Sequence, residues 1–141
     1  MSQENVEIVR RYLSEFNTTH RLPEDMVSPD FVWDMSMFEG WPGQSRYIGV
    51  DEFNAMLVSW TEPYTEWVHE VEQLRDAGRD QVIGMLHQRG RFPGGSSWVE
   101  MHYAIVYTLK DAVIGRAQVY SHPEEALEAI GLSEQDAHAD S

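Results

Sequence analysis

The chain contains no cysteine and has few basic residues, and both shortages narrow its chemistry. Without cysteine, disulfide bridges, thiol nucleophiles and thiolate metal sites are excluded. Only 10 Lys and Arg stand against 24 Asp and Glu, so the formal net charge is −14. Such a chain repels phosphate groups, and we expect neither a nucleic acid nor an anionic membrane surface as a partner.

The sequence also lacks a long apolar segment. No run approaches the roughly 18 apolar residues that a membrane-spanning helix needs, and the polar start, Met1–Asn5, is unlike a signal peptide. We therefore expect a cytoplasmic protein. A length of 141 residues fits one domain with its own core. We predict this domain over residues 1–132 and an acidic, disordered tail over 133–141.

Apolar periodicity predicts the helices. Val6, Val9 and Leu13 recur at the spacing of one helix face, and Phe53, Leu57 and Trp60 repeat that pattern later in the chain. Pro123, followed by two glutamates, is typical of a first helical turn. The predicted helices span residues 4–17, 23–27 and 51–62, and a short one begins at Pro123.

Alternating apolar residues predict the strands, and Gly, Pro and Asp clusters predict the turns between them. The expected strands span residues 31–38, 66–74, 81–91, 97–109 and 113–121. We interpret the segment 39–46 as a loop. The order of helices, one strand, a helix and a four-stranded meander predicts an α+β fold. In it a curved mixed sheet wraps around the N-terminal helices and encloses a pocket.

Asp34 is the one charged residue in the most apolar and aromatic run of the chain. Alternation places it with Val32 and Ser36 on one face of a strand, opposite Trp33. A carboxylate in this setting must find hydrogen-bond donors, take up a proton or face a polar cavity. Two kinds of role stay open, a general base in a pocket or a structural carboxylate, which would either form an ion pair with Arg116 or lie at a strand end in solvent.

The strand at 97–109 is apolar on both faces, which predicts a cavity on one side and helices or a partner chain on the other. Glu100 and His102 share a face, and we predict that they line the cavity. His102 would act as an acid or orient a carbonyl, or it is a structural histidine. On the neighbouring strand, His87 or Arg89 would reach the pocket mouth.

The six histidines show no metal-binding spacing, so we expect no metal site and no cofactor. Tyr12 is a candidate hydrogen-bond donor, although core packing is the competing role. Trp60 and Tyr47 are candidates for an apolar pocket wall.

Motifs along the whole chain resemble the SnoaL-like polyketide cyclase family of the nuclear transport factor 2-like superfamily. The resemblance implies a cone-shaped barrel and a homodimer formed through the outer face of its sheet. This superfamily hosts isomerases, dehydratases, cyclases, hydrolases and non-catalytic binders on one fold, so its fold alone does not fix a function. The matching segments are Val6–Tyr12, Gly49–Phe53, Gln88–Arg91, Gly94–Ser96, Arg116 with Tyr120, and Pro123–Leu132.

Ketosteroid isomerases share this fold, and the resemblance carries two of their residues over. Their catalytic Asp lies on the first strand, where this chain has Asp34, and their oxyanion-binding Tyr lies in the first helix, where it has Tyr12. Ala104 stands where they have a second Asp, which argues against steroid isomerisation. By the same likeness, the face of the last strand with Arg116 looks into the pocket.

Scytalone dehydratases, also similar to this chain, use two pocket histidines. His102 falls near one of them, and His87 lies close to the register of the other. The resemblance therefore implies pocket positions for both.

Two functions remain open at this point. The first is cofactor-free acid–base chemistry of the isomerase, dehydratase or cyclase type on an apolar cyclic ketone or polyketide. Asp34 would remove a proton, and Tyr12 or His102 would stabilise the enolate. The second is a non-catalytic module for lipophilic-ligand binding or dimerisation, favoured if Arg116 neutralises Asp34. The expected substrate contacts are Trp60, Tyr47, His87, Arg89, Glu100, Arg116, Gln118 and Tyr120.

Overall fold

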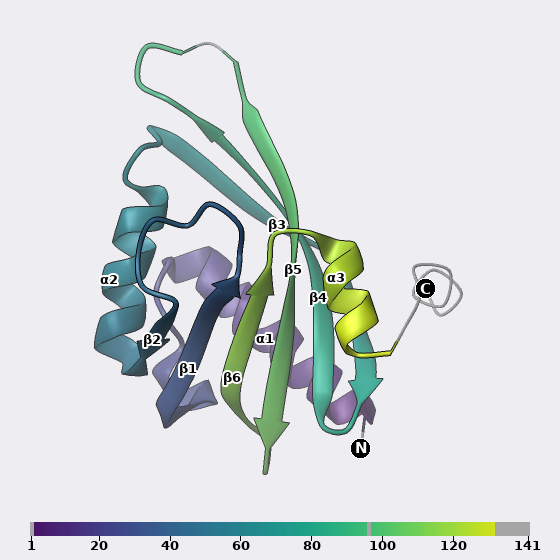
Figure 1. Ribbon diagram of the computed structural model, residues 1–141. Helices are drawn as coiled ribbons and strands as arrows, with labels where there is room; N and C mark the ends of the chain where they lie inside the picture. The colour runs from purple at the N-terminus through teal and green to yellow at the C-terminus, as the bar shows by residue number, and fades with distance from the viewer. Residues whose placement is uncertain (1, 96, 132–141) are drawn as a thin grey trace.

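A computed structural model describes residues 2–95 and 97–131 of the chain. The predicted tail at 133–141 and the last residue of the predicted domain, Leu132, lie outside the described residues. The α+β prediction is confirmed: a curved six-stranded mixed sheet packs against helices (Figure 1). None of the helices within the described ranges has the length and apolar character needed to cross a membrane.

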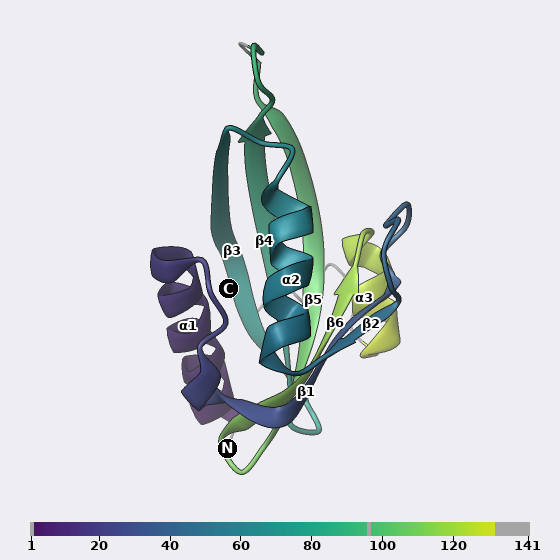
Figure 2. The same cartoon turned by 90° about the vertical axis from the view of Figure 1, so that its left-hand side faces the viewer.

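The sheet has the strand order β2-β1-β6-β5-β4-β3, and all neighbours are antiparallel except β1 and β6. Figure 2 shows α1 and α2 on one side of the curved sheet and α3 on the other. The elements are α1 Ser2–Thr19, the 3-10 helix η1 Glu24–Met26, β1 Val27–Met37, β2 Arg46–Ile48, α2 Gly49–Thr61, β3 Glu66–Gly78, β4 Gln81–Arg91, β5 Val99–Lys110, β6 Val113–Tyr120 and α3 Pro123–Ala129.

The main core lies between the sheet and the helices α1 and α2. As the periodicity predicts, Val9, Leu13 and Phe16 of α1 are buried, and so are Phe53 and Leu57 of α2. Both helices therefore direct a continuous apolar face toward the inside of the cone. Packing of these faces, rather than helix propensity, stabilises the helices.

A smaller apolar cluster lies on the outer face of the sheet under α3. Ala104 and Val106 of β5 pack there with Leu127 of α3. This contact explains why β5 is apolar on both faces. The two-sided pattern that suggested a partner chain is thus accounted for, over this part of the strand, by the chain's own last helix.

Two details differ from the sequence prediction. β1 begins at Val27, earlier than expected, and β2 occupies the end of a segment interpreted as a loop. β2 consists of three residues, too few for an alternating pattern to be recognised. It pairs with β1 so that Arg46 lies directly opposite Asp34.

Candidate functional site

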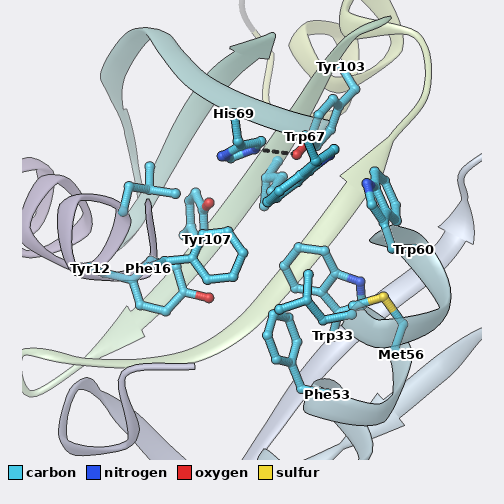
Figure 3. Close-up of a pocket in the computed structure, with 13 residues that line it drawn as sticks. Tyr12, Phe16, Trp33, Phe53, Met56, Trp60, Trp67, His69, Tyr103 and Tyr107 are labelled. Carbon is cyan, nitrogen blue, oxygen red and sulfur yellow. Dashed lines mark hydrogen bonds between the residues drawn. The ribbon is translucent and has the colours of Figure 1, made fainter. Parts of the chain in front are cut away.

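A pocket lies inside the cone, between the two inner helices and the sheet. Its volume is about 30 Å³, which corresponds to roughly one water molecule. Figure 3 shows aromatic rings from α1, α2 and three strands facing one another around it. The lining residues are Tyr12, Leu13, Phe16, Trp33, Phe53, Met56, Leu57, Trp60, Trp67, His69, Tyr103, Ile105 and Tyr107.

Strand alternation explains which residues reach the pocket. On β5, Tyr103, Ile105 and Tyr107 point to the same inner face and are buried. On β3, Trp67 and His69 do the same. The pocket wall is therefore mainly aromatic, with His69 as the one imidazole among its lining residues.

His69 is held by hydrogen bonds at both ring nitrogens. Its Nδ1 lies 2.9 Å from Oδ1 of Asn17, and its Nε2 lies 2.5 Å from the hydroxyl of Tyr103. A carboxamide oxygen only accepts, so Nδ1 carries the proton and Nε2 accepts from Tyr103. The dashed line in Figure 3 marks this second bond.

Burial determines the protonation of these groups. It lowers the pKa of His69 to about 4, with a further lowering from the nearby positive charge of His20. Burial likewise raises the pKa values of Tyr12, Tyr103 and Tyr107 above their usual range. At neutral pH the pocket therefore contains a neutral imidazole and protonated phenols.

Two buried polar groups in the pocket wall have no hydrogen-bond partner among the described residues. They are the indole Nε1–H of Trp33 and the hydroxyl of Tyr107. A buried donor without a partner costs about 1–3 kcal/mol of free energy. A ligand atom with lone pairs in the pocket would recover part of that energy.

Gln88 fixes two of the pocket tryptophans. Its side-chain oxygen is buried and accepts from the indole N–H of Trp60 at 2.6 Å and from that of Trp67 at 3.1 Å. Both rings are therefore oriented by one acceptor on β4. The role of Gln88 is not visible in the sequence, because its partners are 28 and 21 residues away.

Among the sequence-predicted site residues, Tyr12 and Trp60 lie at this pocket. Their roles in binding or catalysis stay predictions. Tyr47 does not reach the pocket. Its hydroxyl accepts from Trp41 Nε1 at 3.0 Å and from the backbone N–H of Gln44 at 2.9 Å, so it braces the loop before β2.

Asp34 lies on the face of β1 opposite Trp33, as the alternation predicted, and is not part of the pocket lining. Only 1% of it is exposed, and it forms a short ion pair with Arg116. Arg46 lies 3.9 Å away, and the backbone N–H of Ser36 donates to Asp34 at 2.8 Å. The ion pair with Arg116 therefore forms, and a role of Asp34 as a general base stays a prediction.

The prediction that Glu100 and His102 line the cavity is wrong. His102 is exposed on the outer face, where its Nδ1 pairs with Glu72 at 3.0 Å and its ring stacks on His87 at 4.4 Å. Glu100 pairs there with His87 at 2.7 Å. The inner face belongs to the larger aromatic residues of β5, which bury more apolar surface against the helices.

The same correction applies to the residues expected from the neighbouring strands. Arg89 pairs with Glu70 at 3.2 Å and is not part of the inner lining. On β6, Gln118 and Tyr120 are hydrogen-bonded to each other at 3.1 Å, and Arg116 holds Asp34. None of these residues lines the inner pocket. The part of the wall that β5 contributes lies on the face opposite to Glu100 and His102.

Sequence reasoning missed the pocket residues His69, Tyr103, Tyr107 and Trp33 as site candidates. A signal was present for β5, since Tyr103 and Tyr107 share one face. The choice of face depends on where the helices pack, and a strand that is apolar on both sides does not reveal it.

No family model matches the sequence, and no curated protein matches it at a significant level. Solved structures match its fold. A structure described as a SnoaL-like polyketide cyclase, from Jannaschia sp. CCS1, has a TM-score of 0.66 at 17% identity, over 85% of this chain and 86% of that one. A nuclear transport factor 2-like protein from Anabaena variabilis ATCC 29413 has a TM-score of 0.66 at 13% identity, over 84% and 90%.

TerC, co-crystallised with polyporic acid, has a TM-score of 0.66 at 13% identity, over 91% of this chain and 98% of that one. Identities this low show the fold alone. The chain has the SnoaL-like, nuclear transport factor 2-like fold, as the resemblance implied.

Proposed function

We propose that the protein binds a small, flat, oxygen-bearing aromatic molecule in the pocket inside the cone. The observation that carries this proposal is the pair of buried polar groups without partners among the described residues, Trp33 Nε1–H and the Tyr107 hydroxyl, in a wall that is mainly apolar and aromatic. Ligand pockets typically combine such walls with a few fixed polar groups. That TerC, a protein of similar fold, was co-crystallised with polyporic acid supports a small-molecule ligand.

The pocket holds about 30 Å³, so binding requires wall side chains to move. Leu57 and Trp67 line both this pocket and a larger surface groove. They form the partition that a ligand has to displace. A buried water that hydrogen-bonds to one of these two polar groups is the competing occupant.

The test compares 2-naphthol with naphthalene, its oxygen-free analogue, against wild type and Tyr107→Phe. We expect 2-naphthol to bind more tightly than naphthalene to wild type, and Tyr107→Phe to remove about tenfold of that preference. In the free protein, Tyr107→Phe deletes an unpaired hydroxyl and is expected to raise the melting temperature. If Tyr107→Phe lowers the stability, and 2-naphthol and naphthalene bind with equal affinity, a water is favoured instead as the occupant of the pocket.

A second candidate function is acid–base catalysis by His69 and Tyr103, favoured by the fixed tautomer of His69. A ligand carbonyl could take over the hydrogen bond from Tyr103, which frees His69 Nε2 to accept a proton from the carbon beside that carbonyl. The electron pair of the broken C–H bond moves onto the carbonyl oxygen, and the Tyr103 hydroxyl stabilises the resulting enolate. A histidine with a pKa of about 4 has the base strength of a carboxylate.

Deuterium exchange of 2-tetralone in heavy water, followed by NMR, tests this candidate. We expect wild type to accelerate the exchange, His69→Gln to lose the acceleration, and His102→Gln to keep it. Asp34→Asn, at a temperature where it is folded, is also expected to keep it, because Asp34 is committed to Arg116. Loss of exchange in Asp34→Asn alone would return the base to Asp34.

The homodimer remains a proposal, and it rests on the fold. The outer sheet face beyond α3 carries ion pairs such as His102 with Glu72 and Arg89 with Glu70, which a second copy would have to cover. Sedimentation velocity over a concentration series measures the oligomeric state directly.

A further inference from the structure

A surface groove beside the pocket has the size of a ligand site. Its volume is about 570 Å³, within the range of about 300–1,000 Å³ that small-molecule sites occupy. It lies between the end of α1, one side of α2 and the start of β3, which Figure 2 shows as neighbouring elements. Its lining residues are His20, Arg21, Asn54, Leu57, Val58, Thr61, Tyr64, Thr65 and Trp67.

The charge of this groove is opposite to that of the chain. The protein carries 24 acidic residues and a net charge of −14, yet no carboxylate is among the described residues that line the groove. Arg21 lines it, and its guanidinium makes no ion pair within 4.0 Å with any part of the chain that the structure describes. Among the described residues, the groove therefore presents a cation without an ion-pair partner.

The remaining wall of the groove is apolar and aromatic. Val58 is 61% exposed there. The ring of Tyr64 stacks on Phe92 at 5.2 Å, and Trp67 contacts the rings of His20 and His69, each at 5.3 Å. A flat apolar body could lie against Tyr64 and Trp67 while its charged group meets Arg21.

We propose that this groove binds the carboxylate of an aromatic acid, with Arg21 as the anion-binding residue. The inference deepens the proposed function, because the groove adjoins the inner pocket through Leu57 and Trp67. It narrows the ligand class from any oxygen-bearing aromatic molecule to an aromatic carboxylic acid. Its ring would press on the partition between groove and pocket, and its acid group would stay at the mouth.

Arg21 has a competing structural role, since it follows the end of α1. A cation near a helix C-terminus interacts favourably with the unpaired carbonyls of the last turn. That role predicts a change in stability on substitution and no change in the preference between ligands. The two roles are therefore separable by measuring a ratio of affinities.

The experiment is calorimetric titration with 2-naphthoate and with 2-naphthylmethanol, which have the same ring system with and without the charge. In wild type we expect the carboxylate to bind about tenfold more tightly. Because a net charge of −14 repels anions from the protein as a whole, such a preference requires a local cation. The preference should weaken as salt is added.

Arg21→Gln is the test variant and Arg11→Gln the matched control, because Arg11 is an exposed residue of α1, the helix before Arg21, and does not line the groove. We expect the affinity ratio to fall close to one in Arg21→Gln and to stay about tenfold in Arg11→Gln. An unchanged ratio in Arg21→Gln, or an equal loss in both variants, overturns the assignment of Arg21.

The outcomes for the two proposals are distinguishable. Suppose that 2-naphthylmethanol binds and that Tyr107→Phe weakens its binding, while 2-naphthoate binds no more tightly than the alcohol. Only the proposal of an anion site at Arg21 then fails. If the carboxylate binds through Arg21 and the alcohol does not bind, the groove stands and the pocket proposal fails. Absence of binding by both probes overturns both.

Discussion

The ion pair of Asp34 with Arg116 predicts an asymmetric response to mutation. Asp34 is 1% exposed, whereas the Arg116 side chain is 39% exposed. Removing the arginine leaves a carboxylate buried, with Arg46 at 3.9 Å and the Ser36 N–H as its remaining partners. Removing the carboxylate charge leaves a guanidinium that can reach water.

The magnitudes follow from that difference in exposure. Breaking a fully buried pair costs about 3–5 kcal/mol, and the exposure of Arg116 favours the lower end, so we expect about 3 kcal/mol for Arg116→Gln. Asp34→Asn keeps an oxygen for the Ser36 N–H, and we expect about 1–2 kcal/mol. At roughly 4 °C per kcal/mol for a domain of this size, the melting temperatures should fall by about 12 °C and about 6 °C.

Thermal and urea denaturation of both single variants and the double variant measure these differences. The double variant should lose less than the sum of the single losses, with a coupling of about 1–2 kcal/mol. Additive losses, or a larger loss for Asp34→Asn than for Arg116→Gln, would contradict the ion pair as the main role of Asp34. An Asp34→Asn protein that keeps its stability but no longer binds ligand would also contradict the ion pair as the main role of Asp34.

Three further predictions concern the pocket and its wall. His69 has a pKa of about 4 when folded and about 6.5 when unfolded, so its stabilising effect is complete above pH 6.5 and is lost as the pH falls toward 4. The free energies of unfolding from urea titrations at pH 7.5 and pH 5 should differ by about 2 kcal/mol more in wild type than in His69→Gln; equal differences refute it. Gln88→Leu leaves one buried and one partly buried indole N–H unpaired and should cost about 2–4 kcal/mol, whereas a cost below about 1 kcal/mol would mean that the rings find other acceptors. Gly90→Ala would place its Cβ 2.6 Å from Tyr64 Cε1, so we expect a loss of about 1–3 kcal/mol that largely disappears in a Tyr64→Ala background.

The helices and the four-stranded meander could be predicted because their signals are local. Val6, Val9 and Leu13 repeat at helical spacing, and burial follows that pattern. The face that Asp34 occupies also followed from alternation alone. Its partner Arg116 lies 82 residues away, and the sequence offered this pairing as one of two alternatives.

The site could not be predicted to the same degree, because it depends on which side of the sheet the helices cover. Alternation separated His102 from Tyr103 correctly but did not say which of them faces inward. The bond of His69 to Asn17 joins residues 52 positions apart, and no local pattern relates them. The groove at Arg21 forms where three elements meet, so its lack of carboxylates is visible only after folding.

The parallel pair of β1 and β6 has a consequence for biosynthesis. In these adjacent strands Val32 pairs with Arg116, so the sheet cannot close until β6 has left the ribosome. Until then the aromatic face of α2 and the inner face of β1 have no complete sheet to cover them. Pairing over such a sequence separation slows folding and prolongs the exposure of apolar surface. We therefore expect nascent chains that stop before β6 to require chaperones, and the final strand to convert them into a protected domain.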